Sequence, residues 1–315
     1  MKKWNILAIL TTMMFPIHLW AEDYSFEVWA KNGVTNQSAA NHGDYLFLVK
    51  NELSSISLYN LAERRLIYTL HLSPRDERKG ESKTVISHCN QSCFGKEKFS
   101  KNDVFPLLYV SQRNPNSSTG AFMDVLRIIP YMDLHHKIDS FHIEQVQKIF
   151  FPVMTDLNCM GNPNAVIDSK GGYLYTYSRN NRKMADNFQE AVITQFRLPL
   201  LHGKDGKIQD VVILHDEDIL ESFNCGFNVL NAQGGFYRKG KIYFVQGLPS
   251  KKEKLNFIYF REIDLKKKRL TRTVDMLNNG FNVEPEGCWY YKGYVMVAGN
   301  SKKMYRLTGK KYKVK

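Results

Sequence analysis

The chain has 315 residues and a formal net charge of +13 at pH 7. Hydrophobic residues make up 43% and charged residues 24% of the sequence, which excludes a collagen-like, low-complexity or intrinsically disordered chain. The excess charge is confined to residues 236–315, which carry 20 Lys and Arg against 6 Asp and Glu. Such a segment either attracts an anionic polymer or blunts exposed strand edges and turns with solvated lysines.

Residues 1–21 have the pattern of a secretory signal peptide. Lys2 and Lys3 give a positive start, an apolar stretch covers residues 4–20, and Ala21 precedes two acidic residues. We expect cleavage after Ala21 and a mature chain, residues 22–315, that is exported to the periplasm or the extracellular space. An uncleaved anchor is disfavoured because polar residues interrupt the apolar stretch. No later stretch approaches the length of a membrane span, and export argues against a nucleic-acid partner.

Short apolar or alternating segments, bounded by turn residues, predict strands along the whole chain. In chain order they are Ser25–Ala30, Tyr45–Lys50, Ser55–Asn60, Arg65–Leu72, Leu107–Gln112, Ala121–Ile129, Phe141–Phe151, Ala165–Asp168, Tyr173–Ser178, Ala191–Leu198, Val211–Leu214, Gly235–Arg238, Lys241–Gln246, Asn256–Asp264, Arg269–Asp275, Gly287–Tyr291, Tyr294–Ala298 and Met304–Leu307. Helical periodicity is nearly absent, and only Tyr131–His136 and Asp216–Ser222 are predicted as short helices. Many short strands with tight turns predict an all-β sandwich, barrel or propeller.

A repeated unit decides between these architectures. It consists of polar residues, a strand, a Gly-containing turn, a second strand and, after a longer connection, two more strands. The units begin near Asn41, Ser87, Ala165, Gly235 and Gly287. They predict a single-domain β-propeller of five blades, while six compact blades would also fit the length. The last unit lacks a fourth strand, so we expect Ser25–Ala30 to supply it and close the ring.

Polar residues stand at the start of each unit. The innermost strands of a propeller line a central channel, so we expect these residues to meet at one mouth of it. The candidate ligand-binding residues are His88, Asn164, Gln233, Glu284 and Glu286. Amides, an imidazole and carboxylates suit a neutral polar ligand, such as a glycan or peptide, or a cation. The alternative is that these side chains only satisfy backbone groups and channel water.

The segment Glu284–Gly287 is the sharpest local motif. Two carboxylates that are two residues apart share one face of a strand, where they repel unless a cation or hydrogen bonds intervene. A divalent cation such as Ca²⁺ is therefore a candidate ligand. Acid–base catalysis is a candidate role, and the enzyme alternative includes metal-dependent hydrolysis of a lactone or glycan that uses Glu286. No nucleophile, base and orienting group are recognisable from spacing, which favours a binding or scaffold protein over an enzyme.

The chain has five cysteines, which are Cys89, Cys93, Cys159, Cys225 and Cys288. An odd number leaves at least one free thiol or an intermolecular bond. No Cys-x-x-Cys pair occurs, so the sequence supports neither a zinc knuckle nor a thioredoxin-type redox site. We expect most of these residues to be small buried apolar side chains.

The run Gln233–Tyr243, followed by Glu284–Gly287 and the turn at Lys292-Gly293, resembles secreted five-bladed propellers. These include glutamine-cyclotransferase-like propellers and bacteriophage receptor-binding or teichoic-acid-associated propellers. The resemblance is confined mostly to residues 233–300. It implies the propeller fold, and its cyclotransferase branch implies an enzyme in which Glu286 is the acidic residue to test. Enzymes and binding proteins share such motifs, so the fold does not settle the function.

Overall fold

The computed structural model describes residues 24–31, 33–34, 36–50, 55–72, 89–112, 121–151, 164–179, 190–203, 205–249 and 257–309. In this part of the chain the regular structure consists of strands and of two 3₁₀ turns, η4 (Asp216–Asp218) and η5 (Leu277–Asn279). None of the described helices is long and apolar enough to cross a membrane. The predicted signal peptide lies outside the described residues.

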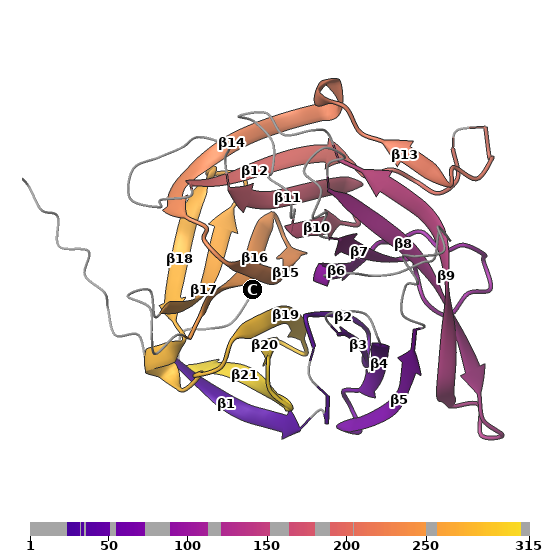
Figure 1. The fold of residues 1–315 in the computed structure, drawn as a ribbon, viewed down its shortest axis with the longest axis horizontal. Coiled ribbons are helices and arrows are strands. Elements are labelled where there is room, and N and C mark those ends of the chain that lie inside the picture. Colours follow the sequence, from indigo (N-terminus) through magenta and orange to yellow (C-terminus); the bar gives the residue numbers. More distant parts are fainter. Residues whose placement is uncertain are drawn as a thin grey trace, which may run out of the picture.

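Five sheets form five blades around a central channel, as Figure 1 shows. Blade 1 contains β2 (Ser38–His42), β3 (Tyr45–Val49), β4 (Ser55–Asn60) and β5 (Arg65–His71). Blade 2 contains β6 (Cys89–Phe94), β7 (Leu108–Gln112), β8 (Phe122–Met132), β9 (Ile138–Phe150) and β13 (Val211–Ile213). Blade 3 contains β10 (Asn164–Asp168), β11 (Tyr173–Arg179), β12 (Glu190–Arg197) and β14 (Ile219–Asn228). Blade 4 contains β15 (Ala232–Arg238), β16 (Lys241–Leu248), β17 (Phe257–Asp264) and β18 (Arg269–Asp275).

Blade 5 joins two distant parts of the chain. It contains β19 (Pro285–Tyr291), β20 (Tyr294–Gly299), β21 (Lys303–Gly309) and β1 (Tyr24–Lys31), in the order β1-β21-β20-β19. Strand β1 pairs with β21 in antiparallel fashion along its whole length. The predicted five-bladed propeller and its closure by the N-terminal strand are therefore confirmed.

The hydrophobic core is divided into five clusters, each between two neighbouring blades. Because side chains alternate along a strand, one strand supplies two clusters. In β3, Leu46 and Leu48 pack against blade 5, whereas Phe47 and Val49 pack against blade 2. This two-sided burial explains why the strands appear in the sequence as short, continuous apolar runs.

Both predicted helices are wrong. Strand β8 continues to Met132, and the chain then turns through residues 133–137 into β9. Helical structure after Asp216 is limited to the three residues of η4, and Ile219–Asn228 forms the outer strand β14. In β14, Phe223, Cys225 and Phe227 alternate with Asn224 and Gly226, a period of two that is typical of a strand.

Candidate functional site in the central channel

The five inner strands, β2, β6, β10, β15 and β19, surround the channel (Figure 1). Residues at or next to the starts of these strands contact one another at one end, which we call the start end. Their last residues meet at the other end, where each strand enters the hairpin or loop that leads to the next strand, and we call this the turn end. The two ends have different chemistry.

A single glutamine closes the channel between the two ends. Gln91 on β6 is fully buried, and its amide reaches across to β15 in blade 4. The side-chain Nε2 donates to Gly235 O at 2.7 Å, and the backbone N–H of Gly235 donates back to Oε1 of Gln91. The Tyr177 hydroxyl oxygen lies 3.3 Å from Gln91 Oε1. Blades 2 and 4 are thus joined across the axis of the ring.

Glycines make this closure sterically possible. A Cβ on Gly235 would overlap Tyr243 O and lie 2.7 Å from the Tyr177 hydroxyl. A Cβ on Gly287 would lie 2.9 Å from the backbone N of Ala39 in blade 1. The backbones of Gly287 and Ala39 therefore approach each other closely, and any larger residue at Gly235 or Gly287 would push the inner strands apart.

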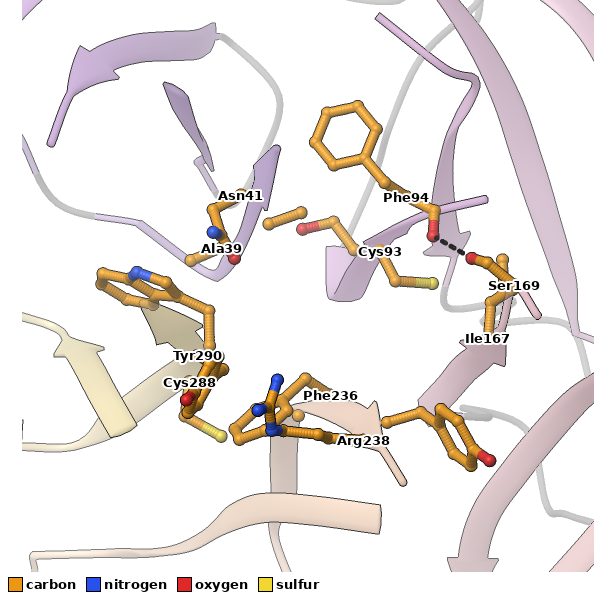
Figure 2. A pocket seen from close by; sticks show the side chains of 15 residues that line it. Ala39, Asn41, Cys93, Phe94, Ile167, Ser169, Phe236, Arg238, Cys288 and Tyr290 are labelled. Atoms are coloured by element: carbon orange, nitrogen blue, oxygen red, sulfur yellow. Dashed lines mark hydrogen bonds between the residues drawn. The ribbon is translucent and has the colours of Figure 1, made fainter. Parts of the chain in front are cut away.

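A cavity of about 260 Å³, which we call the cup, lies on the turn side of Gln91. Gly235 both pairs with Gln91 and lines the cup, so this pair forms its floor. Small side chains, such as those of Ala39 and Cys93, and aromatic side chains, such as those of Phe94 and Tyr290, line the cup together (Figure 2). The residues that line the cup are Ala39, Ala40, Asn41, Ser92, Cys93, Phe94, Ile167, Ser169, Gly235, Phe236, Tyr237, Arg238, Cys288, Trp289 and Tyr290.

Arg238 is the only charged residue among the described residues that line the cup. It is the last residue of β15, and Figure 2 shows its side chain beside Phe236 and Tyr290. Its guanidinium carbon lies 3.7 Å from the centroid of the Tyr290 ring, a cation–π contact that holds the group in place. Within the described residues Arg238 has no carboxylate partner, and its Nε is buried without a hydrogen-bond acceptor.

The start end holds a buried carboxyl instead. Glu286 is 4% exposed, and its Oε2 accepts a hydrogen bond of 2.6 Å from Gln37 Nε2 in blade 1. Burial, assisted by the charge of Glu284, raises the pKa of Glu286 to about 9. Burial also raises the pKa of Glu284, which is half-buried. Glu286 therefore carries a proton at neutral pH.

Two other predicted site residues, Asn164 and Gln233, lie at the start end as well. Asn164 donates from Nδ2 to Ala232 O at 2.9 Å, and its Oδ1 is buried without a partner in the described part of the chain. Gln233 is 9% exposed, and its carbonyl accepts a hydrogen bond from the Tyr177 hydroxyl at 2.7 Å. His88 lies outside the described residues. None of the predicted residues that the structure describes lines the cup, so a ligand site at the start end stays a prediction.

Polar side chains bridge each pair of neighbouring inner strands. The bridges are Ser38–Ser92 between blades 1 and 2, Cys93–Ala165 O between 2 and 3, Asn164–Ala232 O between 3 and 4, Cys288–Gly234 O between 4 and 5, and Gln37–Glu286 between 5 and 1. Cys89, Cys93, Cys225 and Cys288 are free thiols, while Cys159 lies outside the described residues. Burial raises the pKa of each described thiol, which suits a structural role.

Sequence reasoning missed Gln91, Arg238 and Tyr290 as site residues. Arg238 is the last residue of its inner strand, directly before the turn at Lys239-Gly240, and Tyr290 is the second-to-last residue of its strand, two positions before Lys292. A position one or two residues before a Lys-Gly turn was the available signal. As for metals, the described residues contain no group of three or more His, Cys, Asp and Glu side chains that could hold an ion.

No family profile matches the sequence, and no curated protein matches it. Solved structures do share its fold. A Myxococcus xanthus glutaminyl cyclase aligns with a TM-score of 0.50 and 10% identity, over 90% of this chain and 96% of that one. A Thermus thermophilus protein described as a putative oxidoreductase (glucose dehydrogenase) aligns with a TM-score of 0.44 and 12% identity, over 90% and 100% of the two chains. At such low identity, the similarity to the glutaminyl cyclase establishes the propeller fold and leaves the activity open.

Proposed function

We propose that the protein is a ligand-binding propeller that holds a small molecule with an anionic group in the cup. The observation that carries this proposal is Arg238, a cation without a counter-ion among the described residues, at a cavity with a closed floor. A partly buried charge is costly unless it is paired, and a carboxylate or phosphate of a ligand would supply that pair.

The surroundings of Arg238 support the same class of ligand. Tyr290 stacks on one face of the guanidinium. The N–H groups point outward in the plane of the guanidinium, so this stacking leaves them available to an acceptor in the cup. The rings of Phe94, Phe236 and Tyr237 offer an apolar wall to the rest of the ligand. A few polar groups that fix orientation, set in a mostly apolar wall, are the usual composition of a small-molecule site.

The test is calorimetric titration with a panel of small carboxylic acids and their neutral methyl esters. Wild-type protein should bind at least one acid and reject its ester. Arg238→Gln should weaken that binding by about tenfold or more, because a hydrogen bond to a charged group is lost. Arg197→Gln is the matched control, since Arg197 also lies over a tyrosine ring, at 4.7 Å from the Tyr173 centroid, but outside the cup. Equal binding of acid and ester, or an unaffected Arg238→Gln variant, would refute the proposal.

A second candidate is acyl transfer at the start end, with Glu286 as proton donor. What favours it is the buried, protonated carboxyl held by Gln37, together with a glutaminyl cyclase among the structures of this fold. Incubation with a peptide that begins with glutamine, followed by mass spectrometry, tests it. Loss of ammonia that persists in Glu217→Gln and disappears in Glu286→Gln would establish an enzyme. No turnover in the wild type would leave the binding role.

We also propose that the protein is exported and that residues 1–21 are removed. The positive start, the apolar stretch and Ala21 support this. The mass of the protein recovered from the periplasmic or culture fraction of an expressing bacterium should correspond to a chain that begins at Glu22. Recovery of the full-length chain from the cytosol would contradict it.

A further inference from the structure

We propose that the cup is one end of a longer binding path, which crosses blade 4 at the turn end and takes an acidic oligosaccharide. This inference rests on the proposed function, because the end unit of the oligosaccharide would occupy the cup. The path begins at Arg238 and leads outward to the rim of the ring.

The register of blade 4 places charged residues in one row. Arg238 is opposite Lys241, Lys241 is opposite Asp264, and Asp264 is opposite Arg269. These four residues therefore lie side by side, one on each strand from the channel to the rim. With neighbouring strands about 4.8 Å apart, the row is roughly 14 Å long.

Two turns add further cations above this row. Lys239 stands in the turn between β15 and β16, and Lys266, Lys267 and Lys268 stand in the turn between β17 and β18. All four lysines and Arg269 are exposed. Asp264, the one acid in the row, accepts the backbone N–H of Lys267 at 2.9 Å and so stabilises the turn.

Most of these cations lack a partner in the described part of the chain. Lys241 pairs with Glu262, and Lys268 pairs with Glu221. The described residues provide no carboxylate for Lys239, Lys266, Lys267 or Arg269. Unpaired positive charge at Arg238 and Lys239 near the channel, and again at Lys266, Lys267 and Arg269 near the rim, fits a ligand with several anionic groups at intervals.

Blade 4 has more Lys and Arg residues in this row than the first three blades have in theirs. The corresponding rows are His42, Tyr45, Asn60 and Arg65 in blade 1, Phe94, Leu108 and Leu126 in blade 2, and Asp168, Tyr173 and Arg197 in blade 3. Each of these rows has at most one Lys or Arg. The row in blade 4 has three Lys or Arg residues, and it begins at Arg238, the charged residue of the cup.

The direction of the row favours a sugar chain over an acidic peptide. An extended peptide binds a sheet by adding a strand to a free edge. This row runs across four strands that are already paired with one another, so a peptide along it would gain no main-chain hydrogen bonds. A pyranose unit advances a chain by about one strand spacing, and its C–H face can stack on the aromatic rings of the cup.

The experiment compares galacturonic acid with its linear trimer, using maltotriose as the neutral trimer, by calorimetry at low salt. The monomer tests the cup and should lose its binding in Arg238→Gln. The trimer should bind wild-type protein about tenfold more tightly than the monomer, the gain expected from two or three exposed ion pairs. The triple variant Lys239→Gln, Lys266→Gln, Lys267→Gln should lose this gain and keep monomer binding.

The matched control is Lys31→Gln, Lys302→Gln, Lys303→Gln, which removes the same charge from exposed residues of blade 5. It should keep the trimer gain. Salt at about 0.5 M should reduce the gain, because exposed charges are screened. If the monomer binds and the trimer binds no more tightly, or if the gain survives the blade 4 triple variant, the proposed path along blade 4 is wrong, while the proposed binding in the cup is kept. If triglutamate gains more than the sugar trimer, the oligosaccharide class is wrong. If monomer and trimer both fail to bind, the path is wrong, and the panel of carboxylic acids decides the cup separately.

Discussion

At the scale of single residues, Glu286 and Arg238 show how differently the two ends of one channel treat a charge. Glu286 has its pKa raised by burial and so gives up its charge at neutral pH. The guanidinium group of Arg238 is a cation. The start end therefore presents a neutral hydrogen-bonding group, whereas the turn end presents a fixed cation.

The raised pKa of Glu286 gives stability a specific pH dependence. Between the ordinary value of 4.5 and about 9, the folded chain keeps a proton that the unfolded chain has lost. Rising pH in that window therefore lowers the free energy of unfolding, by at most about 1.4 kcal/mol per pH unit. Glu286→Gln should remove this part of the slope, since Gln can still accept the hydrogen bond from Gln37. Urea denaturation at about pH 5.5 and pH 8 measures the difference.

The control for this measurement is Glu217→Gln, at an exposed position of η4. Its unfolding free energy should follow the wild type at both pH values. Parallel slopes for wild type and Glu286→Gln would show that Glu286 is ionised in the folded chain.

The sequence predicts which residues lie at the start end of the channel better than it predicts those at the turn end. Polar residues at the start of each unit were visible in the sequence, and the structure brings the described ones to one end of the channel. The role of Gln91 was hidden, because its partner Gly235 is 144 positions away and belongs to a blade that is not adjacent. In the sequence Arg238 is one more cation of a basic segment, and only the fold shows that it faces a cavity.

At the scale of elements, the hairpins were predictable because turn chemistry and apolar runs agree. Ser55–Asn60 and Arg269–Asp275 have the predicted bounds. Strands β2 and β6 were not predicted, since small and polar residues such as Ser38, Cys89 and Ser92 are buried there by their position in the ring. Burial of inner strands is imposed by the neighbouring blades and leaves little trace in local hydrophobicity.

Strand β1 should contribute to stability through the one side chain that it buries fully. Phe26 is 4% exposed and packs edge-on against Phe281 at 5.7 Å, whereas Val28 in the same strand is 52% exposed. Phe26→Ala should lower the free energy of unfolding by about 3 kcal/mol or more, because it leaves a cavity between blades 4 and 5. Val28→Ala should change it by less than about 0.5 kcal/mol. Similar urea midpoints for the two variants would mean that β1 is not docked as described.

At the scale of the whole molecule, the sequence predicts the number of blades and the manner of closure, because it contains five repeated units and the last unit lacks a fourth strand. Which end of the channel holds a cavity did not follow, because it depends on how closely Gly235 and Gly287 let the inner strands approach. A channel that is blocked in the middle has two independent mouths, and the repeats alone give no reason to prefer one of them.

The pairing of β1 with β21 also bears on how the ring is assembled. The Thr308 hydroxyl donates to Ser25 O across 283 positions of sequence, so this contact is among the last that a folding chain can make. Until it forms, the outer edge of β21 is an open template, and β1 of another copy fits it as well as the chain's own. Refolding at high concentration should therefore produce strand-exchanged dimers and longer chains of propellers, separable by size-exclusion chromatography, whereas dilute refolding should give closed monomers.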